Sequence, residues 1–221
     1  MANKTYLQMV NEVMVRLREP EVTAVTDTAY SKLIGRFIND AKRQVEDAYN
    51  WNAISETVMV STSANLFNYV LTGVGQRFRI IDVINNTQEW FMDFDTTHNM
   101  NAKLLGVNNL TVATGAPRYY NFNGVDSNGD TQVDLYPIPD GVYTLYFNMI
   151  KPQPDFTASA DQIKIPDEPV VFLAYAKALA ERGEDAGVIS NEAYQLYRQS
   201  LADHIATEAN RYPDEITWGA A

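Results

Sequence analysis

The sequence predicts an α+β fold, in which a helical bundle built from N- and C-terminal helices carries an inserted antiparallel β domain. Three observations support this class. Apolar residues recur at helical spacing through the first 50 residues. After residue 56 the period shortens toward two, which is typical of strands, and helical spacing returns after Pro166. Two pairs of helices therefore flank a β-rich middle, and each pair can bury the apolar face of the other.

Two helices are predicted in the N-terminal quarter of the chain. The first spans residues 5–18, with Thr5 as its cap. It ends before Pro20, because the residue before a proline avoids the α region. The second helix spans about 28–50 and is followed by Trp51. We expect Trp51 to pack where this helix meets the sheet, with stacking on a ligand as the less favoured alternative.

The middle of the chain is predicted to hold six or seven short strands, which run mainly antiparallel because their loops are short. Three of them form a meander within 115–150. Its turns lie at Asn128-Gly129 and Asp140-Gly141, since these pairs favour the positive φ of tight hairpins. Residues 95–114 are predicted to be a surface loop that gains order on contact with a partner, with a short helix near 98–105 as the alternative. The other strands are expected at 56–60, 66–71, 77–86 and 88–94.

Two further helices are predicted near the C-terminus. The first, at about 170–183, is apolar nearly all round, so it should be the most buried helix of the protein. The second is expected at about 191–210, with Ser190 as its cap and Pro213 beyond its end. Its inner face is predicted to consist of Ala193, Leu196, Tyr197, Leu201 and Ile205.

These elements divide the chain into three parts. Residues 1–53 together with 166–212 are expected to form the helical bundle, and residues 54–165 the inserted β-rich domain. Residues 213–221 form a C-terminal tail without a periodic pattern of its own.

Composition excludes several classes of function. The chain of 221 residues has no cysteine, which rules out disulfides, zinc–thiolate sites and thiol catalysis. A net charge of −11 without a cluster of Lys and Arg disfavours specific binding to duplex DNA. No apolar run approaches the roughly 20 residues of a membrane helix, and the polar N-terminus is unlike a signal peptide. We therefore expect a soluble, intracellular protein with no membrane partner.

No catalytic, cofactor-binding or metal site is predicted. Residues 126–134 superficially resemble a calcium loop, but Thr131 and Pro137 occupy the positions where an EF-hand needs glycine and glutamate. A hairpin turn is the favoured interpretation. His98 and His204 lack partners at metal-binding spacing. Without a convergent motif, the protein is predicted not to be an enzyme and to need no cofactor.

Several segments follow one another in a recognisable order: DAKRQVEDAYNWNA, RFRIIDVIN, GAPRYYNFNG, LYPIPDGVYTLYFNM, LAYAKALAERGEDAG and RYPDEITWG. Their order resembles that of the head-to-tail adaptor proteins of short-tailed phages, the podoviruses. These are the tail tubular protein A type, also called gatekeeper or head completion proteins. The resemblance covers nearly the whole chain. It implies a helical bundle with a β-rich domain and a homo-oligomeric ring of twelve copies in the virion, between the portal protein and the tail nozzle protein.

The resemblance also implies that the C-terminal segment reaches the portal. In this sequence it corresponds to residues 212–221, with Tyr212, Ile216 and Trp218 as the expected portal-binding residues. DNA would pass through the lumen of the ring without specific binding. Carboxylates facing the lumen would repel phosphates and favour sliding, although solubility alone explains the acidic balance equally well.

A carbohydrate-binding β module on a helical mount is the alternative from a different class. The 13 Tyr, 9 Phe and 3 Trp are compatible with stacking on sugars as well as with core and subunit packing. This alternative requires exposed, coplanar aromatic side chains on the sheet.

Overall fold

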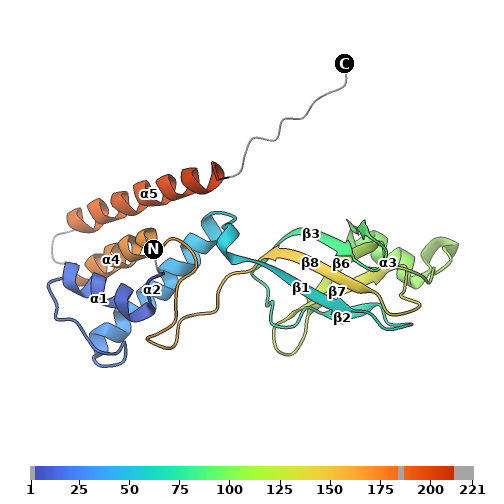
Figure 1. Ribbon diagram of the computed structural model, residues 1–221, viewed down its shortest axis with the longest axis horizontal. Helices are drawn as coiled ribbons and strands as arrows, with labels where there is room; N and C mark the ends of the chain where they lie inside the picture. Colours follow the sequence, from blue (N-terminus) through green and yellow to red (C-terminus); the bar gives the residue numbers. More distant parts are fainter. Residues whose placement is uncertain (1–2, 184–186, 212–221) are drawn as a thin grey trace, which may run out of the picture. The chain divides into compact units, whose positions relative to one another are not determined.

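The computed structural model describes residues 3–183 and 187–211, and it divides the chain into two compact units (Figure 1). One unit comprises Met1–Ile54 with Gln153–Ala221 and is helical, whereas Ser55–Pro152 form a β-rich unit. The predicted α+β class, with terminal helices flanking a β region, is confirmed. Residues 153–165 belong to the helical unit, although the sequence places them in the β-rich part.

Among the described residues of the helical unit, one helix packs against three others (Figure 1). This helix is α4, Asp167–Arg182, whose residues Val170, Val171 and Ala174 are completely buried, in line with its predicted central position. The other helices are α1 (Tyr6–Arg16), α2 (Ala29–Ala48) and α5 (Val188–Ala209), with a 3-10 turn, η1, at Asn52–Ile54.

The starts of the helices follow local side-chain chemistry. Thr5 caps α1 as predicted: its hydroxyl accepts a hydrogen bond from Gln8 N, and the Gln8 side chain accepts one from Thr5 N. The start of α5 differs from the prediction. Gly187, with a φ of 91°, precedes the helix, and Ser190 lies within it and donates its hydroxyl hydrogen to Gly187 O.

The inner face of α5 is narrower than predicted. Ala193 and Tyr197 are buried as expected, but Leu196 is 50% exposed. Among the described helices, α4 is the main neighbour of α5, so only one stripe of α5 is covered. That stripe continues through Ser200 to Glu208 and leaves Leu196 outside it.

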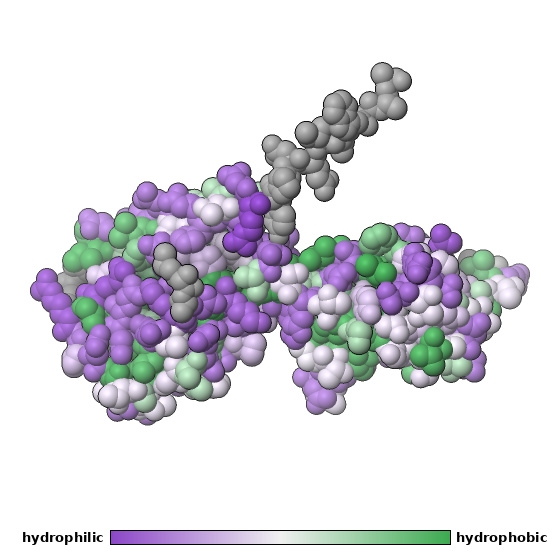
Figure 2. All heavy atoms as spheres, viewed as in Figure 1, coloured by the Kyte–Doolittle hydropathy of each residue, from purple (hydrophilic) through white to green (hydrophobic). Residues whose placement is uncertain are grey.

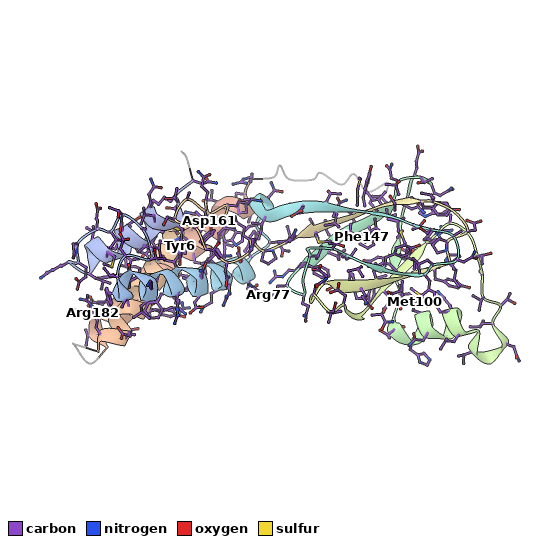
Figure 3. All side chains as sticks on the ribbon, turned by 90° about the horizontal axis from the view of Figure 1, so that it is seen from below. Tyr6, Arg77, Met100, Phe147, Asp161 and Arg182 are labelled. Atoms are coloured by element: carbon purple, nitrogen blue, oxygen red, sulfur yellow. The ribbon has the colours of Figure 1, made fainter. Side chains whose placement is uncertain are left out.

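Residues 153–165 belong to the helical unit because α1 and α2 hold their backbone. Asn39 forms two hydrogen bonds with the main chain of Phe156, and Tyr6 N donates to Asp161 O over 2.7 Å. Figure 3 shows Tyr6 and Asp161 close together in this unit. A single β-bridge joins Gln162 to Thr5. Backbone groups that a sheet would satisfy are satisfied here by helix side chains and the start of α1.

The β-rich unit consists of two four-stranded sheets with the orders β1-β8-β3-β4 and β2-β7-β6-β5. All pairs are antiparallel except β5 with β6. The core lies between the sheets, where Phe147 is completely buried (Figure 3). The strands are β1 (Ser55–Ser61), β2 (Asn68–Val70), β3 (Arg79–Asn85), β4 (Trp90–Phe91), β5 (Asp93–Phe94), β6 (Tyr119–Val125), β7 (Thr131–Tyr136) and β8 (Thr144–Ile150).

The predicted three-stranded meander is wrong in one respect. β6 and β7 pair through the turn at Asn128-Gly129, where Gly129 has a φ of 85°, as expected. β8 instead pairs with β1 and β3 in the other sheet. The segment around Asp140-Gly141 is therefore a crossing between sheets and not a hairpin turn. It contains Pro137 and Pro139, which restrict the backbone and disfavour a tight return.

Residues 95–114 contain the helix that the sequence left as the alternative. α3 spans Thr97–Leu105 and is followed by a 3-10 turn, η2, at Val107–Asn109. Met100 anchors α3 in the β-rich unit. Lys103 forms an ion pair of 2.7 Å with Asp95 and lies 3.9 Å above the ring centre of Tyr119. Although burial opposes it, the hydrogen bond from Lys103 lowers the pKa of Asp95.

Candidate functional site

The end of α5 is held on the helical unit. The expected portal-binding residues Tyr212, Ile216 and Trp218 lie outside the described residues, which end at Arg211. Just before this point, the buried Glu208 accepts a hydrogen bond from Asn52 N over 3.1 Å and forms an ion pair of 2.8 Å with Arg211. The contact with Asn52 joins the last turn of α5 to η1.

The turn that resembles a calcium loop is held by its own backbone. Asp126 accepts hydrogen bonds from Asn128 N and Asp130 N, at 2.8 and 2.9 Å. Asp130 accepts from Gly73 N and Gly75 N, and these backbone bonds lower its pKa. The hairpin interpretation is confirmed, because these carboxylates cap backbone amides. Across residues 3–183 and 187–211, no group of three or more His, Asp and Glu side chains could hold a metal ion.

Neither histidine lies in an arrangement that indicates catalysis. His98 is exposed on α3, and His204 lies in α5, where its Nδ1 is 2.8 Å from Ser200 O. The hydroxyl of Ser200 donates to Glu168 over 3.0 Å. The bond between Ser200 and Glu168 joins α5 to α4, whereas His204 contacts the backbone of its own helix.

A cluster of aromatic side chains packs around Tyr120 in the β-rich unit. Tyr120 meets Phe94, Phe122 and Phe147 at interplanar angles of 71°, 69° and 84°. These rings meet edge-on, including Phe94, which is 59% exposed, and this arrangement differs from the coplanar platform that sugar stacking requires. Trp51 is 1% exposed and donates its indole N–H to Val45 O, so its ring face is not accessible to a ligand.

An apolar row crosses the outer face of the sheet β1-β8-β3-β4. Met59 lies opposite Tyr146, Tyr146 opposite Ile84, and Ile84 opposite Phe91, so that each strand contributes one residue. The two ends of the row are the most exposed, with Met59 at 64% and Phe91 at 67%. Figure 2 shows hydrophobic side chains among polar ones on the side of this unit where β3 lies. Exposed apolar residues gathered in this way indicate an interaction surface.

A polar row lies directly beside the apolar one. Thr57 Oγ1 donates to Asn148 Oδ1 over 2.5 Å, and Asn148 Nδ2 donates to Asp82 Oδ1 over 2.6 Å. These cross-strand bonds hold β1, β8 and β3 in register. The apolar row is therefore presented on an ordered support.

The helical unit has an apolar groove of its own between α2, α4 and α5. Its volume is about 390 Å³, and four of its eight lining residues come from α4. Tyr194, which is 44% exposed, lies at its α5 side. The remaining lining residues are Gln44, Leu173, Ala176, Lys177, Ala180, Ser190 and Asn191. Both units thus carry apolar surface that is open within the described residues.

The sequence was compared with known protein families. Residues 4–218 match the family described as SU10 adaptor protein. The chain belongs to the SU10 adaptor protein family. This is a family of phage head-to-tail adaptors, so the resemblance noted in the sequence is confirmed. A search of curated proteins found no match.

Membership of this family indicates what kind of protein presents these surfaces. A head-to-tail adaptor is a structural component of the phage virion and interacts with other virion components. Such a protein acts through its surfaces, in keeping with the exposed apolar row and groove. Among the helices of the described residues, none is long and apolar enough to cross a membrane.

Proposed function

We propose that this adaptor forms a ring between the portal and the tail nozzle of a podovirus and lines the passage for DNA. The family match over residues 4–218 carries the proposal, because it spans both units and reaches into the C-terminal segment. The open apolar surfaces on both units support it, since a ring subunit must contact neighbours as well as the proteins above and below it. By resemblance, the ring contains twelve copies.

The portal contact is proposed to lie in the C-terminal segment. Tyr212, Ile216 and Trp218 are large apolar residues in a short stretch that also contains Asp214 and Glu215. An aromatic anchor in a partner pocket commonly dominates binding. Because Glu208 fixes the end of α5, every copy in a ring would direct this segment from the same position.

Removing the segment should separate portal binding from folding. A variant lacking residues 213–221 should bind the portal at least about 30-fold more weakly, as expected when an anchor contributing about 2 kcal/mol or more is lost. Its thermal unfolding should be unchanged, because the truncation keeps the contacts of Glu208 with Asn52 and Arg211 that hold the end of α5. Trp218→Ala should reproduce most of the loss. Isothermal titration against purified portal measures both variants, and unchanged affinity of the truncated protein would refute the portal contact.

We propose that the excess of acidic over basic residues favours the passage of DNA. The chain has 28 acidic and 17 basic residues. Carboxylates around the lumen would repel phosphates and prevent the DNA from sticking while the genome is ejected. The charge map of an assembled ring tests this part, and a basic lumen would contradict it. The ring itself is tested by electron microscopy of the adaptor mixed with its portal.

A further inference from the structure

The sheet β1-β8-β3-β4 has one long open edge. β1 pairs with β8 over seven residues without a bulge, and on its other side it has no strand in the described part of the chain. The other edge strands are much shorter: β2 has three residues, and β4 and β5 have two each. Natural edge strands are usually short or protected by Lys, Pro or a bulge. Residues 55–61, SETVMVS, contain none of these.

The direction of the backbone groups on β1 follows from its hydrogen bonds to β8. Thr62 N donates to Tyr143 O over 2.9 Å, in the position that follows the pair Ser61–Thr144. Backbone bonds of antiparallel strands alternate along the chain. Every second residue of β1 therefore bonds β8, whereas Thr57 and Met59 direct their N–H and C=O groups toward the open edge.

The opposite edge of the same sheet presents the complementary pattern. Met92 N donates to Val83 O over 2.7 Å, so the next residue pair, Phe91 with Ile84, is not joined by backbone hydrogen bonds. Phe91 on β4 therefore directs its N–H and C=O away from β3. The side chain of Phe91 and that of Met59 are the two exposed ends of the apolar row.

We propose that β4 of one copy pairs with β1 of the next copy, so that the sheets of neighbouring subunits become continuous. This inference rests on the proposed ring and names the contact between its subunits. Successive strands of the sheet are antiparallel, so β1 and β4 run in opposite directions. A second copy placed beside the first in the same orientation then pairs β4 with β1 antiparallel, like all other pairs of this sheet.

Side chains as well as backbone groups match in this arrangement. With Phe91 opposite Met59 of the next copy, both residues offer N–H and C=O groups, and together they form two hydrogen bonds. Their side chains stand on the same face and continue the apolar row from one subunit into the next. The contact joins two different edges, so it is heterologous and can close into a ring. Pairing of β1 with β1 of a second copy would stop at a dimer.

Cysteine cross-linking tests this contact sharply, because the natural chain has no cysteine. Hydrogen-bonded strand neighbours have Cα atoms about 5.5 Å apart, within the range that a disulfide bridges. An equal mixture of M59C and F91C proteins, assembled with the portal and oxidised with diamide, should give a covalent dimer. Neither protein alone should give one, and the double variant M59C/F91C should give a ladder of covalent oligomers.

Each outcome decides between hypotheses. Rings seen by electron microscopy without the mixed dimer would overturn the edge contact and leave the adaptor function standing. A dimer of M59C alone would show that β1 pairs with β1. If no ring forms with the portal, the proposed function fails, and this inference fails with it.

Proline substitution provides an independent test at the same position. Met59→Pro removes an N–H that points away from β8, so the pairing with β8 is kept. The adaptor concentration needed for ring assembly should rise at least tenfold. Met59→Ile, which keeps the N–H and an apolar side chain, should assemble like the natural protein. Equal assembly of both variants, with folding verified by circular dichroism, would overturn the contact.

Discussion

Replacing Lys42 with alanine should lower the free energy of unfolding of the helical unit by about 3–5 kcal/mol. The side chain of Lys42 is completely buried in α2. Its Nζ donates to Gln153 O over 2.6 Å and to Pro154 O over 3.1 Å. It also forms an ion pair of 3.4 Å with Glu46, which is buried on the next turn. The substitution leaves the carboxylate of Glu46 and two backbone carbonyls without this cation.

Arg43 provides the matched control on the same helix. It forms an ion pair with Asp155, which lies in residues 153–165 beside the carbonyls that Lys42 binds. Both side chains of this pair are more than 40% exposed. Exposed pairs contribute little, so Arg43→Ala should cost less than about 1 kcal/mol. Urea unfolding followed by tryptophan fluorescence compares the two variants. Equal losses for Lys42 and Arg43 would contradict the role assigned to the buried cation.

Replacing Phe147 with alanine should destabilise the β-rich unit by about 3–5 kcal/mol. Phe147 of β8 is completely buried between the two sheets, and its ring meets Tyr120 of the other sheet at a centroid distance of 6.2 Å. The smaller side chain removes apolar contacts and leaves a cavity that the two sheets can fill only in part.

Phe91 is the control for this substitution, because it is the same residue type in the same sheet but lies on the exposed face. Phe91→Ala should change stability by less than about 0.5 kcal/mol. Thermal unfolding followed by near-ultraviolet circular dichroism distinguishes the variants. A loss for Phe91→Ala as large as that for Phe147→Ala would mean that the outer row belongs to the core of the subunit.

Much of the fold could be predicted because its signals are local. The cap at Thr5, the apolar pattern of α4 and the turn at Asn128-Gly129 each depend on neighbouring residues alone. The helical spacing of α5 was equally clear. Which of its apolar residues is covered depends on the neighbours of the helix, and for that reason Leu196 was assigned wrongly.

Features that depend on distant residues were missed. β8 follows β7 in the chain but joins the other sheet, and short-range turn signals favour the simpler meander. The course of residues 153–165 depends on Lys42 and Asn39, more than 100 residues earlier in the chain.

The apolar row on the sheet could not be predicted either, because it also depends on distant residues. The apolar row needs the register of three strand pairs, and alternation in TVMV and LYFN indicates strands without fixing which residues face one another. The assignment of Trp218 and Ile216 as anchors stays a prediction, because it rests on their size in the C-terminal tail and both lie outside the described residues.

Electron microscopy of the adaptor mixed with its portal protein tests the central claim most directly. The account predicts closed rings of adaptor attached to one end of the portal, twelve copies in each, with a continuous channel along the axis. The adaptor lacking residues 213–221 serves as the control and should leave the portal bare. Portal particles that stay bare in the presence of the complete adaptor, at concentrations where both proteins are folded, would contradict the account.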